Sequence, residues 1–144
     1  MRVTILILLL LNLFITSCNK QNTSIDITAF NGYWEIDKVI TSSGKETNYG
    51  FNEYVDFFNT KDSLGFRNKV KPQFGGKYLS NNQQINYRIN TKNDSVFLTY
   101  QNAFTSWSDY VISANNKQIC IQNKEGISYY YRPYTPIIID EEEN

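Results

Sequence analysis

Phe30-Asn31-Gly32-Tyr33-Trp34-Glu35-Ile36 opens the long aromatic-rich part of the sequence and decides its fold class. Asn31 and Gly32 favour a turn, and the aromatic and branched residues that follow favour an extended strand. Similar short segments, rich in Tyr, Phe, Ile, Val and Thr and separated by Gly, Asn, Asp and Ser, continue as far as Arg132. None of them has the periodicity of an amphipathic helix. The sequence therefore predicts an all-β domain.

The segments between these breaks predict about eight antiparallel strands joined by short turns. The candidate strands are Tyr33–Ile40, Glu53–Phe58, Leu64–Val70, Ile85–Asn90, Ser95–Tyr100, Trp107–Ser113, Lys117–Gln122 and Ile127–Arg132, with a weaker segment, Lys77–Ser80, that extends or bridges its neighbours. A meander of this length must protect its edge strands. We expect a single antiparallel up-and-down barrel, with an open barrel or a β-sandwich as the alternatives.

The sequence before this domain has a different character. Residues 3–14 are strongly apolar and follow Arg2, but they are fewer than the ~20 residues that a membrane-spanning helix needs. Ile15-Thr16-Ser17 then leads directly to Cys18. This arrangement resembles the lipobox of bacterial lipoproteins, which implies a signal peptide at residues 1–17 and a lipid on Cys18. An uncleaved membrane anchor and an ordinary secretory signal are the alternatives.

The rest of the chain divides into three parts. Residues 18–28 are polar and predict a flexible tether, residues 29–136 form the predicted barrel domain, and residues 137–144 form an acidic tail. The first acidic residue after Cys18 is Asp26. In the lipoproteins that this chain resembles, early acidic residues accompany export to the cell surface. The resemblance therefore favours a lipid-anchored envelope protein on the outer membrane that faces the periplasm, with exposure on the cell surface as the alternative.

Charge and residue types restrict the function. The chain has 14 basic and 14 acidic residues, which gives no support to a nucleic-acid partner. It has no histidine, which excludes Ser-His-Asp and Cys-His nucleophiles and removes the commonest zinc ligand. Cys120 lies between two isoleucines and is expected to be a buried apolar side chain. Glu35 and Asp37 share a strand face but have no third partner to suggest paired-carboxylate catalysis. We expect no enzyme activity, no metal and no cofactor.

The two ends of the predicted domain share features with one β-barrel family. Gly32-x-Trp34 opens the first strand, and Tyr129-Tyr130-Tyr131-Arg132 ends the last. This pattern resembles the lipocalins, and most closely the short lipocalin-like lipoproteins of bacteria. The resemblance implies that Trp34 packs across the closed end of the barrel and that Arg132 lies over its indole, a contact that contributes ~0.5–2 kcal/mol. The domain is shorter than most lipocalins, and we find neither a disulfide nor a helix after the last strand.

A lipocalin-like barrel implies that a small apolar or amphipathic ligand binds inside it, although an eight-stranded barrel can also fill its interior with side chains. The candidate ligand-binding residues are Arg67, Lys69, Tyr87, Tyr100, Trp107, Tyr110 and Tyr129. Arg67 and Lys69 lie on one face of a predicted strand. An inward orientation of that face favours an acidic ligand such as a fatty acid, and an outward orientation makes it a solvated surface. The alternative function is a protein-interaction module, an inhibitor of an envelope enzyme or a subunit of an envelope complex, with a filled barrel.

Overall fold

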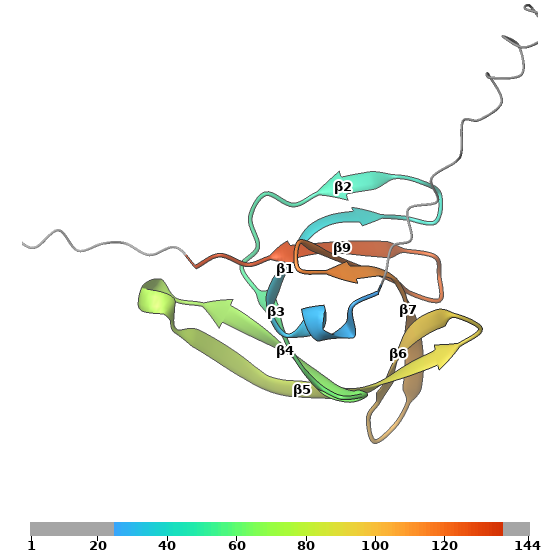
Figure 1. The fold of residues 1–144 in the computed structure, drawn as a ribbon. Helices are drawn as coiled ribbons and strands as arrows, with labels where there is room; N and C mark the ends of the chain where they lie inside the picture. Colours follow the sequence, from blue (N-terminus) through green and yellow to red (C-terminus); the bar gives the residue numbers. More distant parts are fainter. Residues whose placement is uncertain (1–24, 137–144) are drawn as a thin grey trace, which may run out of the picture.

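The computed structural model describes residues 25–136, which form one sheet of nine strands that closes on itself (Figure 1). The strands are β1 (Gly32–Ile40), β2 (Glu46–Asn48), β3 (Val55–Lys61), β4 (Leu64–Pro72), β5 (Tyr78–Lys92), β6 (Ser95–Gln101), β7 (Ser106–Asn115), β8 (Gln118–Gln122) and β9 (Ser128–Pro133), with two short 3-10 turns, η2 (Ile27–Phe30) and η3 (Phe74–Gly76). The predicted signal peptide, the lipidated Cys18 and the acidic tail lie outside the described residues.

The strand pairing confirms the predicted up-and-down barrel. From β3 to β9 each strand pairs antiparallel with the next, and β9 pairs with β1 to close the barrel. Strand β1 pairs with β3 through Gly32–Trp34 and with β2 through Lys38–Ile40. Strand β2 was not predicted, because its three residues are all exposed and polar and carry no apolar alternation. Eight strands therefore form the barrel, and β2 is a short addition at its edge.

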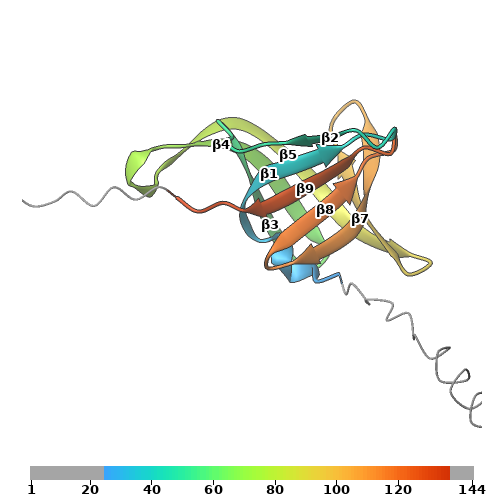
Figure 2. The same ribbon diagram turned by 90° about the horizontal axis from the view of Figure 1, so that it is seen from above.

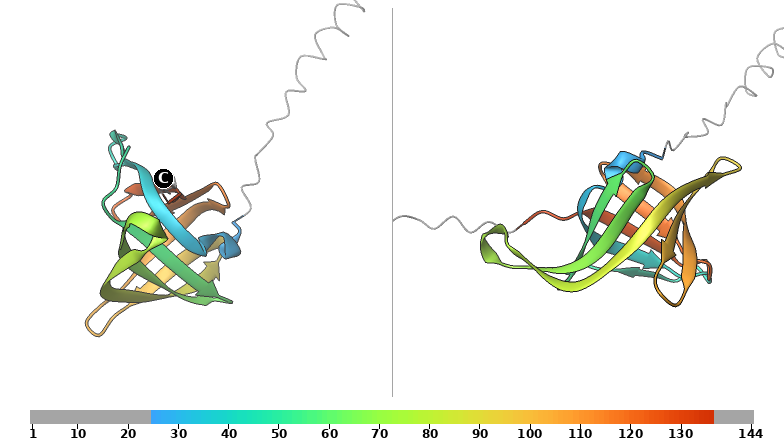
Figure 3. Two further views of the ribbon diagram at one scale, coloured as in Figure 1. Left: turned by 90° about the vertical axis from the view of Figure 1, so that its left-hand side faces the viewer. Right: turned by 90° about the horizontal axis from the view of Figure 1, so that it is seen from below.

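Strand β5 is longer than any predicted strand. It joins Lys77–Ser80 and Ile85–Asn90 into one element, as the bridging alternative expected, and it pairs with β4 on one side and β6 on the other. The pairing of β4 with β5 shifts register between Asn68 and Val70. Beyond this irregularity the β4–β5 hairpin, with η3 at its tip, extends away from the barrel wall (Figure 3).

The 3-10 turn η2 covers one end of the barrel (Figure 2). Asp26 caps it by accepting a hydrogen bond from the Thr28 amide at 2.9 Å, and the Asp26 amide donates to the carbonyl of Ala114 at 2.9 Å. Phe30 is fully buried in the barrel core. Ile25 and Ile27 pack against the same core. The predicted tether at residues 18–28 is therefore wrong at its end, because the apolar residues from Ile25 onward belong to the folded domain.

The barrel interior is filled with aromatic side chains near this closed end. Trp34 is 4% exposed, as predicted for the first strand, and Phe58 packs edge-on against Phe30 with ring centroids 5.8 Å apart. Tyr87 lies over Gly65, where an added Cβ would come within 2.6 Å of the Tyr87 ring and of the carbonyl oxygen of Asn59. Glycine at position 65 therefore makes room for the large side chain on the neighbouring strand.

Candidate functional site

The end of the barrel away from η2 contains a cavity of about 550 Å³. Its rim comes from the loop before β7 and the turn between β8 and β9, and its walls come from the inner faces of β1, β4, β7, β8 and β9. The apolar and aromatic wall residues are Ile36, Trp107, Ile121, Tyr129 and Tyr131, and the charged ones are Arg67, Lys69, Asp109, Lys124 and Glu125. A cavity of this size with a few convergent polar groups is typical of a small-molecule site.

Four of the seven predicted ligand-binding residues line this cavity, namely Arg67, Lys69, Trp107 and Tyr129. Tyr87 and Tyr100 lie deeper, at 3% and 1% exposure, and belong to the core. The prediction for Tyr110 is wrong. Because side chains alternate along a strand and Val111 is buried inside, Tyr110 lies on the outer face, where it packs against Phe97.

Arg67 points into the barrel and is held there by a buried carboxylate. Its Nε and Nη2 groups donate to the two oxygens of Asp56 at 3.0 and 2.9 Å, and Nη2 also donates to the Tyr131 hydroxyl at 3.0 Å. Asp56 is 2% exposed. Burial alone would lower the pKa of Arg67, but Tyr131 and Asp56 outweigh this effect and hold that pKa well above its usual value. Arg67 is therefore a fixed, permanently charged group.

The sequence left open whether the face of β4 that carries Arg67 and Lys69 points inward or outward, and the structure shows that it points inward. Lys69 follows Arg67 on the same face, with its ammonium 3.5 Å from Asp56, and its side chain is half exposed at the cavity. Arg67 also lies against two aromatic rings, 5.3 Å from the centroid of Phe58 and 5.8 Å from that of Tyr131. Two cations therefore line the cavity on this side, and both are held by the buried carboxylate of Asp56.

Tyr100, Trp107 and Tyr131 lie where the cavity borders the hydrophobic core. The ring of Trp107 stacks on that of Tyr100 at 5.1 Å with an interplanar angle of 18°. Burial raises the pKa of Tyr131 to about 12, and burial also raises the pKa of Tyr100, so both phenols are neutral at physiological pH. The Tyr100 hydroxyl is buried and has no hydrogen-bond partner among residues 25–136.

Asp109 is one of several cavity residues that the sequence did not predict. It lies on β7, two residues after Trp107, and it lines the same cavity. Burial raises the pKa of Asp109, and the charge of Arg67 opposes that shift. Because side chains alternate along a strand, Asp109 shares the face of Trp107 and could have been placed inside the barrel. Nothing else in this polar segment of the sequence indicates that Asp109 lines a binding site. The same reasoning applies to Asp56, two residues before the buried Phe58.

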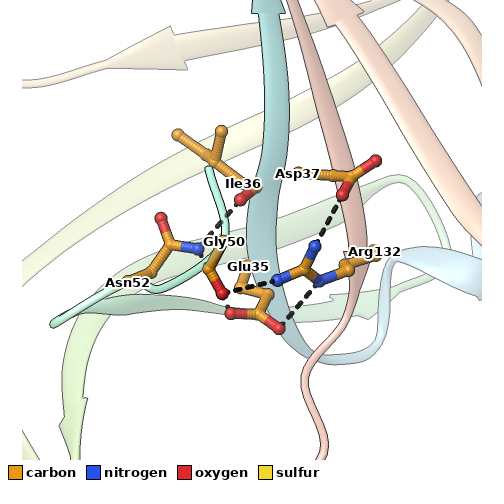
Figure 4. A network of polar contacts seen from close by, with 6 residues as sticks. All are labelled: Glu35, Ile36, Asp37, Gly50, Asn52 and Arg132. Atoms are coloured by element: carbon orange, nitrogen blue, oxygen red, sulfur yellow. Dashed lines mark hydrogen bonds and ion pairs between the residues drawn. The ribbon is translucent and has the colours of Figure 1, made fainter. Parts of the chain in front are cut away.

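Arg132 does not lie over the indole of Trp34, and that predicted contact is wrong. Its partner across the β1–β9 pairing is Glu35, which faces the opposite side of β1 from Trp34. Arg132 donates to Glu35 at 2.9 Å and to Asp37 at 2.6 Å, and Asn52 binds Glu35 and the carbonyl of Ile36 (Figure 4). Arg132 therefore joins β9 to β1 from outside the barrel.

The part of the chain that the structure describes offers little for metal or thiol chemistry. No group of three His, Cys, Asp or Glu side chains between residues 25 and 136 is placed to hold a metal ion. Cys120 is fully buried, and burial raises the pKa of its thiol, which disfavours the reactive thiolate. No helix within that range is long and apolar enough to cross a membrane.

Comparisons with known proteins give structural neighbours and no relative in sequence. No known family model matches the chain, and no curated protein matches it. A lipocalin-like protein from Bacteroides uniformis is similar in structure, with a TM-score of 0.46 and 8% identity, over 74% of this chain and 99% of that one. An uncharacterized protein from Bacteroides eggerthii has a TM-score of 0.46 and 13% identity, over 73% of this chain and 99% of that one. The assignment of a closed barrel rests on the strand pairing described above.

Proposed function

We propose that this protein binds a small amphipathic molecule in the cavity at the barrel mouth and catalyses no reaction. The observation that carries the proposal is the position of Arg67, a fixed cation with part of its side chain open to an aromatic-walled cavity. Ion pairs and hydrogen bonds to Asp56 and Tyr131 hold the guanidinium before any ligand arrives. Binding to a preorganised site avoids the cost of ordering its side chains.

The walls of the cavity suit the apolar part of such a ligand. Trp107 and Tyr129 present rings on different strands, and Ile36 and Ile121 add aliphatic surface. Burying apolar ligand surface there contributes roughly 25 cal/mol per Å² before the costs of association. The polar groups then fix the orientation of the ligand more than they add to its affinity.

A fluorescence titration tests this function. The purified domain is titrated with dansyl amphiphiles, and their emission is followed by direct excitation of the dansyl group. Thr105 lies on the cavity rim and its side chain makes no hydrogen bond within the described residues, so Thr105→Phe should narrow the entrance. Thr47→Phe, the same change on exposed β2, is the matched control. We expect saturable binding that Thr105→Phe weakens by about tenfold and Thr47→Phe leaves unchanged.

We also propose that the protein is anchored in the cell envelope by lipid on Cys18 and faces the periplasm from the outer membrane. Support comes from the apolar residues 3–14 and the lipobox-like Ile15-Thr16-Ser17-Cys18 sequence. Stable anchoring takes more than one acyl chain, which a diacylated cysteine provides. Mass spectrometry of the mature protein tests this claim, and a free amino terminus downstream of Cys18 or a retained Met1 would contradict it.

A protein-interaction module is the second candidate, and one surface feature favours it. Phe51 and Phe74 are 81% and 78% exposed and flank a groove of about 470 Å³ outside the barrel, which Pro72 and Tyr134 also line. Exposed large apolar side chains that gather around a groove mark interaction sites in other proteins. Absence of saturable binding in the titration, for every probe, would favour this candidate.

A further inference from the structure

The ligand cavity contains a carboxylate whose charge is not balanced by an ion pair. Asp109 lines the cavity together with Arg67 and lies close enough for the Arg67 charge to lower its pKa, against the larger effect of burial. Within residues 25–136, Asp109 makes no ion pair of 4.0 Å or less and no side-chain hydrogen bond. A partly buried carboxylate without a partner is costly, so a ligand that supplies a donor to it gains more than one that does not.

Arg67, in contrast, is already neutralised by the protein. Asp56 takes two of its N–H groups and Tyr131 takes a third. Its Nη1 group makes no hydrogen bond to any residue of the described chain. Arg67 can therefore donate to a ligand acceptor through Nη1 without giving up its bonds to Asp56.

The total charge around the cavity also argues against a simple acid as the ligand. Arg67 and Lys69 carry two positive charges, and Asp56 and Asp109 carry two negative ones, although Asp109 forms no ion pair with either cation. At the rim, Lys124 and Glu125 lie 3.6 Å apart and offset each other. A fatty-acid carboxylate would meet a site without net positive charge and with a carboxylate facing it. The inward basic face was expected to select an acidic ligand, but the carboxylates of Asp56 and Asp109 already offset its positive charge.

We infer that the ligand carries a head group with both a hydrogen-bond acceptor for Arg67 and a hydrogen-bond donor, preferably an ammonium, for Asp109. The chemical class is a zwitterionic amphipathic molecule such as an amino-acid derivative with an apolar or aromatic tail against Trp107 and Tyr129. This inference rests on the proposed function of the cavity, and it adds Asp109 as the residue that determines specificity.

Three dansyl probes with similar tails and different head groups test the inference. Dansyl-aminohexanoic acid ends in a carboxylate, dansylcadaverine ends in an ammonium, and Nε-dansyl-lysine ends in both. Each is titrated at neutral pH into the wild-type protein, Asp109→Asn and Asp94→Asn. Asp94→Asn is the matched control, because it makes the same acid-to-amide change at an exposed position in the turn between β5 and β6 that does not line the cavity.

We expect Nε-dansyl-lysine to bind the wild-type protein about tenfold more tightly than the acid probe. Asp109→Asn should abolish this preference, and Asp94→Asn should retain it. The inference is wrong if the acid probe binds most tightly, if Asp109→Asn leaves the ranking unchanged, or if both variants change it equally. Those results would leave ligand binding itself intact, whereas the failure of every probe to bind would overturn the proposed function together with the inference.

Discussion

Removing either partner of the ion pair between Asp56 and Arg67 should destabilise the protein, because the remaining charge stays buried without its partner. Asp56 is 2% exposed and accepts two hydrogen bonds from Arg67, at 3.0 and 2.9 Å. Breaking a buried pair by removing one partner typically costs 3–5 kcal/mol, because the other charge stays buried. Lys69, 3.5 Å from Asp56, remains as a weaker partner, so we expect Arg67→Met to cost about 3 kcal/mol. Asp56→Leu should cost a similar amount, because it leaves Arg67 without a carboxylate.

The double variant separates this explanation from simple loss of packing. Replacing both partners by apolar side chains removes the uncompensated charge, so the double variant should lose about as much free energy of unfolding as either single variant. That result corresponds to a coupling energy of about 3 kcal/mol. Equilibrium unfolding in urea, monitored by Trp fluorescence, measures all four proteins. Additive losses, with the double variant losing about 6 kcal/mol, would refute the argument, and so would an Arg67→Met variant as stable as the wild-type protein.

Other substitutions test the packing, the cavity and the outer seam. Gly65→Ala should lower the free energy of unfolding by about 1–3 kcal/mol, because its Cβ meets the Tyr87 ring and backbone at 2.6 Å, and wild-type stability would contradict this packing. Burial raises the pKa of Asp109 above its ordinary value of 3.8; the charge of Arg67 lowers this pKa and that of Glu125 raises it. The folded protein therefore holds this proton more tightly than the unfolded chain, and the wild-type protein should lose stability as the pH rises from 3.8 through the raised pKa. Asp109→Asn should then be the more stable protein at neutral pH and equal to wild type below pH 3.8 in urea unfolding, and a pH-independent difference would exclude this cause. Trp34→Ala should cost about 3–5 kcal/mol, because it leaves a cavity in the core. Arg132→Met should cost about 1 kcal/mol, because it breaks ion pairs that are partly exposed to solvent. Equal losses in urea unfolding would contradict the placement of Trp34 inside the barrel and Arg132 outside it.

The strands could be predicted from the sequence because local patterns determine them. Each candidate strand from Tyr33 to Arg132 corresponds to a strand of the barrel, and turn residues such as Asn115-Asn116 mark the breaks between them. Strand β2 could not be found, because three exposed polar residues carry no pattern of their own. Its pairing depends on the neighbouring edge of β1, which only the folded chain supplies.

The candidate site was harder to predict because it depends on which face of each strand is inside. Arg67 and Lys69 could be grouped by alternation, but their inward orientation depends on Asp56, which the β3–β4 register brings opposite Lys69. Arg132 was assigned to the indole of Trp34 by resemblance. The register instead places it opposite Glu35, on the outer face. Long-range register therefore decides the chemistry of this cavity, and the sequence alone does not specify it.

The most direct test of ligand binding at the barrel mouth uses the two tryptophans of the chain as internal reporters. Trp107 lines the cavity, and Trp34 is buried near the covered end. In a nitrogen-15 NMR spectrum each indole N–H gives its own signal, which can be assigned with Trp107→Phe. On titration with Nε-dansyl-lysine, we expect the Trp107 signal to shift saturably and the Trp34 signal to stay in place. A Trp107 signal that does not move while signals from residues around Phe51 and Phe74 shift would contradict a ligand site inside the barrel.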